Sequence, residues 1–196
     1  PVCTTSVTTA SAGTDASQCE SVGTYALNGN IPSTGTGAWS ILSQPAGASA
    51  SIANLSLANS GVTGLTVAGD YNFAWTITSS NPACPPSIDY VKVTVNPNPV
   101  ASISGNTDVC AGLATTLTAS GGTSYAWNTT ETMAAITTST DATYTVTVTA
   151  NGCTDVATTT VTVNPLPTAA ITPNSPVVVC EGDDITLTAT GGTNYV

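Results

Sequence analysis

The chain has 196 residues, of which 41% are hydrophobic and only 6% are charged, and its net charge at pH 7 is −10. With Lys92 as the only basic side chain, it lacks the cations that a nucleic-acid backbone or an anionic lipid surface attracts. For this reason we expect no nucleic-acid partner. The chain has no histidine, which excludes His-based catalytic triads. Because no apolar run approaches about 18 residues, we also expect no insertion into a membrane.

The composition favours β-structure. Thr is roughly one residue in five and stands among Val, Ala, Leu and Ile, which suits the half-buried surface of a pleated sheet. Side chains that favour long helices are scarce, with one Met and no Arg. We therefore predict an all-β fold.

An internal repeat organises the chain. The pair Asn96-Pro97 recurs after 68 positions at Asn164, and the Gly-Gly-Thr-x-Tyr element that begins at Gly121 recurs after 70 positions at Gly191. A fixed internal period indicates a repeat architecture. The predicted division is a last strand of a preceding repeat (1–10), a first complete domain (11–96), a second domain (97–164) and the first strands of a further, incomplete domain (165–196).

The segment 1–10 is interpreted as a tail because its residues from Cys3 to Thr9 parallel the residues that begin at Cys153. On this interpretation the partner of Cys3 lies upstream or in another chain. A Cys3–Cys19 bridge within the chain is the alternative.

The first domain holds the clearest strand, residues 71–78, in which Tyr71, Phe73, Trp75 and Ile77 alternate with small or polar residues. Alternation with a period of two marks a strand with one buried face. Further strands are predicted at residues 24–27, 38–41 and 89–95.

Two Asn- and Pro-rich segments, residues 96–99 and 164–167, are predicted to be stiff linkers, because Pro fixes its own φ and extends the residue before it. Between them, Asn151-Gly152 is a strong signal for a two-residue hairpin. The strands predicted for the second domain are residues 101–104, 115–120, 124–128, 133–138, 143–149 and 154–163.

Six cysteines without any Cys-x-x-Cys pair indicate a disulfide framework in an oxidising compartment. From the order of the strands we predict the pairs Cys19–Cys84 and Cys110–Cys153, one in each domain. Chain-entropy arithmetic assigns about 4 kcal/mol to either. Cys180 is then left to pair between domains or between chains, as is Cys3.

The repeated residues carry a resemblance. The order Gly-Gly-Thr-x-Tyr-x-Trp, Tyr-Thr-Val-Thr-Val-Thr, Asn-Gly-Cys and Thr-Val-Thr-Val-Asn-Pro resembles the tandem Ig-like and PKD-like repeats of large surface proteins of Bacteroidetes-type bacteria, among them gliding-motility adhesins. The resemblance implies tandem Ig-like β-sandwich domains in an elongated array. It also implies an extracellular, secreted or surface-attached location and a part in adhesion or fibre building.

Candidate chemistry is sparse, and we predict no enzyme and no required cofactor. Glu181, Asp183 and Asp184 form the one tight acidic cluster and are candidate Ca²⁺ ligands, with Asp15 as a further one. Solvated turn carboxylates are the simpler interpretation of all four.

Lys92 and the tryptophans each have a functional and a structural interpretation. Lys92 is the one amine that could form an isopeptide cross-link, but its strand position favours a solvent-facing side chain. Asn54 and Asn128 begin N-glycosylation patterns. The three tryptophans could form a sugar-binding platform, but their positions in phase with the strands favour core packing. They are Trp39, Trp75 and Trp127.

Three functions are considered. The leading one is a structural module of an extracellular surface fibre or stalk, with neighbouring copies or flanking repeats as partners. The alternatives are a carbohydrate-binding or adhesive module, with surface glycans as partners, and an accessory segment of a secreted hydrolase. Two interpretations of the chain ends stay open: residues near Cys3 of one copy complete the unit after Thr168 of the next by strand addition, or the sequence is a window of a longer polypeptide.

Overall fold

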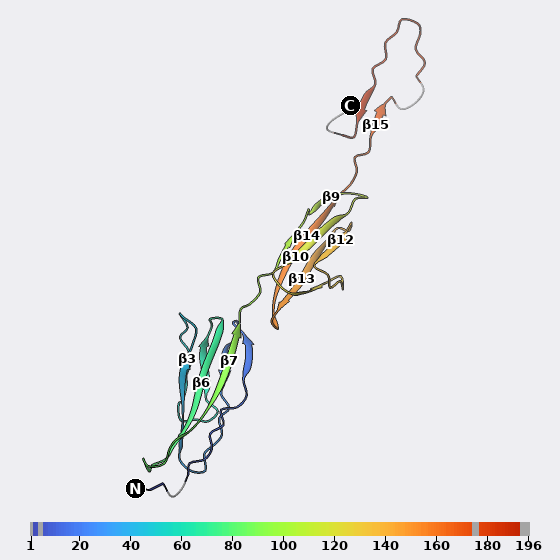
Figure 1. The fold of residues 1–196 in the computed structure, drawn as a ribbon. Helices are drawn as coiled ribbons and strands as arrows, with labels where there is room; N and C mark the ends of the chain where they lie inside the picture. The colour runs from blue at the N-terminus through green and yellow to red at the C-terminus, as the bar shows by residue number, and fades with distance from the viewer. Residues whose placement is uncertain (1, 4–5, 174–176, 193–196) are drawn as a thin grey trace.

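A computed structural model describes residues 2–3, 6–173 and 177–192 of the chain, and these residues form strands, turns and no helix. Figure 1 shows two β-sandwiches and a third, smaller strand pair following one another along an elongated chain. Buried side chains gather in two separate cores, one between Ala10 and Val95 and the other between Val109 and Val161. The predicted all-β array is therefore confirmed, whereas the boundaries at residues 10, 96 and 164 stay predictions.

The first sandwich has a four-stranded sheet of order β1-β7-β6-β3 and a three-stranded sheet of order β2-β5-β4. Their bounds are β1 Ala16–Cys19, β2 Gly23–Ala26, β3 Thr36–Ser43, β4 Ser51–Ile52, β5 Gly61–Leu65, β6 Gly69–Thr78 and β7 Ser87–Asn96. All of the strand pairs are antiparallel except β1 and β7, which run parallel.

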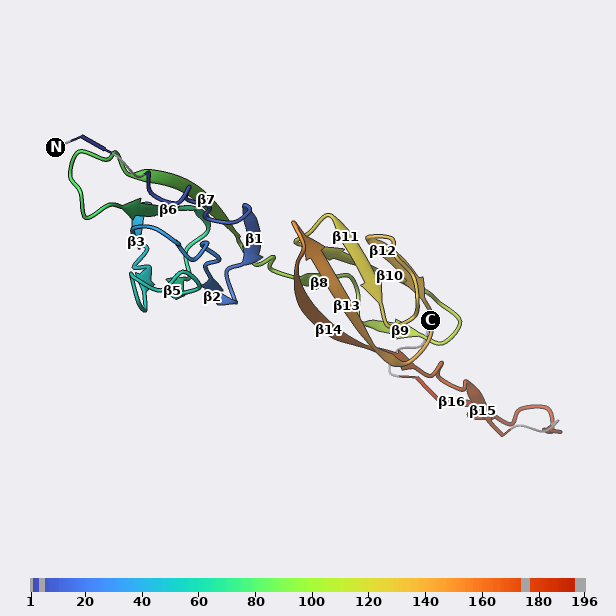
Figure 2. The same ribbon diagram turned by 90° about the horizontal axis from the view of Figure 1, so that it is seen from below.

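The second sandwich has a four-stranded sheet of order β11-β13-β14-β9, which repeats that of the first, and a three-stranded sheet of order β12-β10-β8. Its bounds are β8 Ser102–Ser104, β9 Asp108–Cys110, β10 Thr115–Ser120, β11 Ser124–Trp127, β12 Ala135–Thr138, β13 Ala142–Ala150 and β14 Cys153–Asn164. Here β9 runs parallel to β14, as β1 does to β7. Figure 2 shows the two sandwiches from below, joined by a single short connection.

The third unit has two described strands, β15 (Ala170–Thr172) and β16 (Thr188–Thr190), which pair antiparallel. Ile171 lies opposite Ala189, as Ile103 lies opposite Ala119 in the second sandwich. The pair thus repeats β8 and β10, the first strands that the sequence predicts for this unit.

Side-chain hallmarks identify both sandwiches as Ig-like. Tyr71, near the start of β6, donates its hydroxyl to the carbonyl oxygen of Val67 at 2.9 Å, and Tyr144 on β13 does the same to Thr140 at 3.3 Å. A tyrosine that bonds back to the preceding backbone at this corner is typical of Ig-like domains. A buried tryptophan on the adjacent strand, Trp39 in one and Trp127 in the other, is a second hallmark.

The buried faces are those that the alternation predicts. Tyr71, Phe73, Trp75 and Ile77 are all at most 1% exposed. The ring of Trp75 lies 4.9 Å from that of Trp39, and both indole nitrogens donate to backbone carbonyls. Burying an indole with its N–H satisfied combines a large apolar gain with no unpaired donor.

The short parallel strands β1 and β9 were not predicted, and they determine which residues lie at the ends of each sandwich. Part of the predicted tail packs on the first sandwich: Val7 contacts its core and Ala10 is buried in it, as is Ala12 just after the tail.

Gly37 provides a test of the first core, because a Cβ at this position would overlap the indole ring of Trp75. We expect Gly37→Ala to lower the free energy of unfolding of the first sandwich by about 1–3 kcal/mol, the usual cost of overpacking. Urea unfolding followed by tryptophan fluorescence measures the change.

Gly61 supplies the matched control, because a Cβ there would meet open space. Gly61→Ala should change the free energy of unfolding by less than about 0.5 kcal/mol. Equal losses in the two variants would contradict the packing described for Trp75.

Candidate functional site: the junction between the two sandwiches

The junction begins where the first sandwich ends. Strand β1 lies parallel to β7 so that Cys19 is opposite Asn96, the last residue of β7. The N–H of Glu20 donates to the Asn96 carbonyl at 2.9 Å, and the N–H of Val22 closes a turn onto Cys19 at 3.0 Å. Cys19 is therefore held at the end of the sandwich from which the chain leaves.

The other side of the junction is the β13–β14 hairpin of the second sandwich. Asn151 and Gly152 have φ values of +50° and +79° and connect Ala150 to Cys153. Two central residues with positive φ form the tight turn that suits antiparallel strands, and Asn-Gly is the pair that favours it. The hairpin predicted from the sequence is confirmed.

A disulfide joins the two sides. The Cys19–Cys153 bond spans a Cα–Cα distance of 5.5 Å and connects residues 134 positions apart. Beside it, the side-chain amide of Asn96 donates to the carbonyl oxygen of Asn151 at 3.1 Å. Cys153 is 1% exposed, so the bond is covered on the side of the second sandwich.

A carboxylate fixes the chain as it enters the second sandwich. Asp155, two residues after Cys153, accepts a hydrogen bond from the N–H of Ala101 at 2.8 Å. This bond, with a second one from the N–H of Val156, lowers the pKa of the Asp155 carboxyl below its ordinary value of 3.8. The hairpin therefore holds the linker at both ends, Asn96 on one side and Ala101 on the other.

The first sandwich holds the segment before it in the same way. Cys84, which precedes β7, forms a disulfide with Cys3 at a Cα–Cα distance of 4.8 Å. Asp89 accepts from the N–H of Ala12 at 2.7 Å, as Asp155 does from Ala101. In each sandwich the cysteine at or just before the start of the last strand thus bonds to a cysteine that precedes the sandwich in the chain.

The predicted pairs Cys19–Cys84 and Cys110–Cys153 are therefore wrong, and so is the alternative Cys3–Cys19. Strand β7 has 10 residues and β14 has 12, so at about 3.3 Å per residue their ends lie about 30 and 36 Å apart. Within each sandwich the two cysteines lie near opposite ends of that strand, whereas a disulfide needs Cα atoms within about 7 Å. The upstream or inter-chain partner predicted for Cys3 is replaced by Cys84.

Two cysteines of the described chain, Cys110 and Cys180, are exposed thiols outside any disulfide. The inter-domain or inter-chain pairing predicted for Cys180 stays a prediction. A Cys3–Cys180 bridge, which strand addition between copies would use, is not available while Cys3 is bonded to Cys84.

The acidic candidates do not form a metal site in the described residues, which contain no group of three His, Cys, Asp or Glu side chains placed to hold an ion. Glu181, Asp183 and Asp184 are exposed, and the N–H of Asp183 closes a turn onto Cys180 at 3.0 Å. Asp15 instead accepts a hydrogen bond from the N–H of Lys92 at 2.9 Å, which ties β7 to the segment before β1.

The remaining candidates have structural contacts. The side chain of Lys92 is 43% exposed, and its Nζ lies 3.7 Å from Oδ2 of Asp70, with which it forms an ion pair. The amide of Asn128 bonds to the backbone of Thr143 and Thr145, and the oxygen of Asn54 accepts from Ser56 two residues on. Core packing is confirmed for the tryptophans, which are at most 4% exposed; they are Trp39, Trp75 and Trp127.

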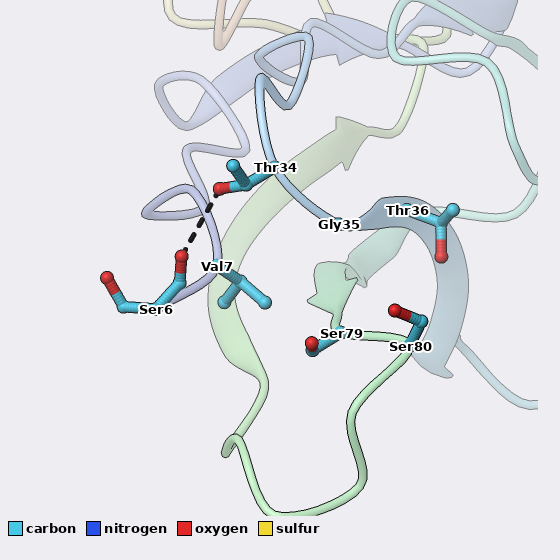
Figure 3. Close-up of a pocket in the computed structure, with 7 residues that line it drawn as sticks. All are labelled: Ser6, Val7, Thr34, Gly35, Thr36, Ser79 and Ser80. Atoms are coloured by element: carbon cyan, nitrogen blue, oxygen red, sulfur yellow. Dashed lines mark hydrogen bonds between the residues drawn. The ribbon is translucent and has the colours of Figure 1, made fainter. Parts of the chain in front are cut away.

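A cavity of about 450 Å³ opens at the other end of the first sandwich (Figure 3). It is lined mainly by hydroxyl groups, and Thr34 donates to the carbonyl oxygen of Ser6 at 3.3 Å. None of its lining residues carries a carboxylate, imidazole, thiol or amine side chain. They are Ser6, Val7, Thr34, Gly35, Thr36, Ser79 and Ser80.

No helix in the described part of the chain is long and apolar enough to cross a membrane.

No family model and no curated protein matches the sequence. Among solved structures, the chain is similar to Sidekick-1 immunoglobulin domains 1–4 (TM-score 0.47, 9% identity, 83% of this chain and 51% of that one). It is also similar to an amphioxus IgVJ-C2 molecule (TM-score 0.41, 14% identity, 74% of this chain and 99% of that one). A third similar structure is the insect immune protein hemolin (TM-score 0.44, 12% identity, 81% of this chain and 47% of that one). The chain spans about half the length of the Sidekick-1 fragment. Its Ig-like class rests on the sheet order and the tyrosine corners.

The single basic residue allows a direct test of the disulfides. Trypsin cleaves after Lys92, which separates Cys19 from Cys153 in sequence. After free thiols are alkylated, digestion in mild denaturant without reductant should leave the two fragments joined, and reductant should release them. Mass spectrometry measures both states.

The Cys153→Ser variant is the control for this digestion, because it removes the predicted link and should release the fragments without reductant. Release of fragments 1–92 and 93–196 from the unreduced native chain would instead support disulfides within each sandwich.

Asp155 predicts a dependence of stability on pH. Because its pKa is lowered in the folded state, its stabilising contribution is complete above the ordinary pKa of 3.8 and is lost as the pH falls through the folded pKa. We therefore expect the stability difference between the native chain and Asp155→Asn to be constant from pH 7 to about pH 5 and to shrink at lower pH. Urea unfolding followed by NMR signals of Val146 and Val148 measures it.

Asp184→Asn is the matched control, because it removes the same charge from an exposed side chain. Its difference from the native chain should be small throughout this pH range. A difference for Asp155→Asn that grows on acidification would overturn the assignment.

Proposed function

We propose that this chain is a structural module of an extracellular surface fibre or stalk, in which successive Ig-like domains are locked to one another and hold an adhesive surface away from the cell. The observation that carries the proposal is the Cys19–Cys153 disulfide, which joins one domain to the next. A bond between domains adds nothing to the core of either domain. Its direct effect is on their relative orientation.

Several restraints act on the same joint. The disulfide, the Asn96–Asn151 hydrogen bond and the Asp155–Ala101 hydrogen bond all connect to one hairpin. The segment between Asn96 and Ala101 contains two prolines, which limit its backbone further. Domains joined by a flexible Gly/Ser linker would behave as a loose string, whereas this joint supports a rod.

The same bonds support the proposed extracellular location. Structural disulfides persist in oxidising compartments, outside the cell or in the periplasm, and are rare in a reducing cytosol. This chain has two disulfides, Cys3–Cys84 and Cys19–Cys153. The resemblance to repeats of bacterial surface adhesins, carried by the sequence elements around Gly121 and Asn151, points to the same compartment.

The alternative of a carbohydrate-binding module receives less support from the side chains. Its most obvious platform was the set of three tryptophans, and these are committed to the two cores. The adhesive ligand is therefore left to surfaces other than the tryptophans, or to other parts of the assembly.

Spin-label distance measurements test the proposed stiffness. One label is placed on Cys110 in the second sandwich and one on Lys92→Cys in the first, with Cys180→Ser removing the other exposed thiol. We expect a narrow distance distribution that broadens when Cys19→Ser and Cys153→Ser are introduced together. The circular dichroism spectrum should stay the same, because the bond lies outside both cores.

The matched control removes the other disulfide with Cys3→Ser and Cys84→Ser, which should leave the width unchanged because that bond does not cross the labelled joint. A distribution that is already broad in the oxidised chain would contradict the function as a rigid module.

A further inference from the structure

The end of the second sandwich repeats the end of the first. Cys110 closes β9 opposite Asn164, as Cys19 closes β1 opposite Asn96. The N–H after each cysteine donates to that asparagine carbonyl, from Ala111 at 2.8 Å and from Glu20 at 2.9 Å. The backbone that presents the thiol is therefore the same at both ends.

The turn that follows each cysteine is also repeated. The N–H of Leu113 bonds to the carbonyl of Cys110 at 3.0 Å, as the N–H of Val22 does to Cys19. The same turn occurs a third time, with Asp183 bonding to Cys180 at 3.0 Å. Three cysteines thus begin one structural element, and the first of them forms a disulfide with a hairpin of the next domain.

The chain leaves both ends in the same way. Asn96 is followed by Pro-Asn-Pro and Asn164 by Pro-Leu-Pro, so the two linkers share their length and both proline positions. The strand pair after the second linker, β15 and β16, repeats β8 and β10 after the first. A domain that continues this strand pair would place its own β13–β14-type hairpin next to Cys110, as the second sandwich places its hairpin next to Cys19.

We propose that Cys110 is a docking cysteine, which forms an inter-domain disulfide with the hairpin cysteine of an Ig-like domain placed after the linker at residues 164–167. The inference rests on the proposed function and names the partner of each joint. Both observed disulfides follow the same rule, since Cys84 and Cys153 each bond to a cysteine that precedes their own sandwich. Cys180, at the equivalent place in the third unit, would serve the joint after that.

The bond forms by a balanced exchange. The two thiols lose two protons and two electrons as the S–S bond forms. A disulfide oxidant such as oxidised glutathione accepts the electrons and is reduced to two thiols. The exposed position of Cys110 leaves its sulfur open to this exchange.

An insertion into the full chain tests the proposal. A second copy of residues 97–164 is placed directly after Asn164, so that the hairpin of the inserted copy follows Cys110 as the native hairpin follows Cys19. The chain is refolded in a glutathione buffer, and its disulfides are mapped by mass spectrometry without reductant.

We expect three disulfides: Cys3–Cys84, Cys19–Cys153 and a new bond between the first Cys110 and the Cys153 of the inserted copy. Thiol titration under denaturing conditions should then find two thiols, the second Cys110 and Cys180, the same number as in the chain without the insertion. Cys110→Ser in the first copy should raise this number to three by freeing the Cys153 of the inserted copy.

Four thiols in the inserted chain would overturn the proposal, because both Cys110 and the new Cys153 would then be unbonded. So would a bond of the inserted Cys153 to the Cys110 of its own copy, or a bond of the first Cys110 between two molecules. If the Cys19–Cys153 bond is present in any of these cases, the proposed function stands and only the repeated use of the joint fails.

Discussion

The parallel pairing of a short edge strand with the last strand of each sandwich is the constraint on which the joint depends. Because β1 runs in the same direction as β7, its final residue, Cys19, reaches the end at which the chain leaves the sandwich. In the second sandwich the tip of the β13–β14 hairpin lies at the end opposite to Asn164, where the chain leaves that sandwich. The hairpin therefore carries Cys153 toward the preceding domain. Stacking end to end brings these two thiols together, whereas closing a bond within one sandwich would require its cysteines to cross the length of a strand.

The sequence predicts the long strands well and the short ones poorly, and this difference explains the error in the disulfides. In β6 the alternation of large apolar residues with small or polar ones extends over residues 71–78, so the sequence alone reveals its buried face. Strands β1 and β9 have 4 and 3 residues, too few for a period to show, and tertiary pairing alone defines them. Without them, nothing in the sequence places Cys19 and Cys110 at the exit end of a sandwich, and pairs within each domain are the simplest assignment.

The acidic residues show a second limit of sequence reasoning. Their scattered positions suggest solvated turn carboxylates, but four of them accept hydrogen bonds from backbone N–H groups of distant segments. These are Asp15, Asp89, Asp141 and Asp155. Asp89 and Asp155 each satisfy the N–H of a residue outside any strand, Ala12 and Ala101. This is valuable because an unpaired backbone group costs free energy when it is shielded from water. The signal that was available is the placement of Asp89 and Asp155 shortly after a hairpin cysteine, which recurs in both domains.

Because the chain has a single basic side chain, it has almost no means of joining its domains by ion pairs. Lys92 forms the one ion pair found among the described residues, and it lies within the first sandwich, so no ion pair there connects the domains. An interface of oppositely charged side chains would weaken as salt is added, because ions screen exposed charges over about 10 Å at moderate ionic strength. A disulfide and a hydrogen bond between the neutral side chain of Asn96 and a backbone carbonyl are insensitive to that screening. The two bonds that cross the junction therefore depend on the redox state of their surroundings and not on the salt concentration.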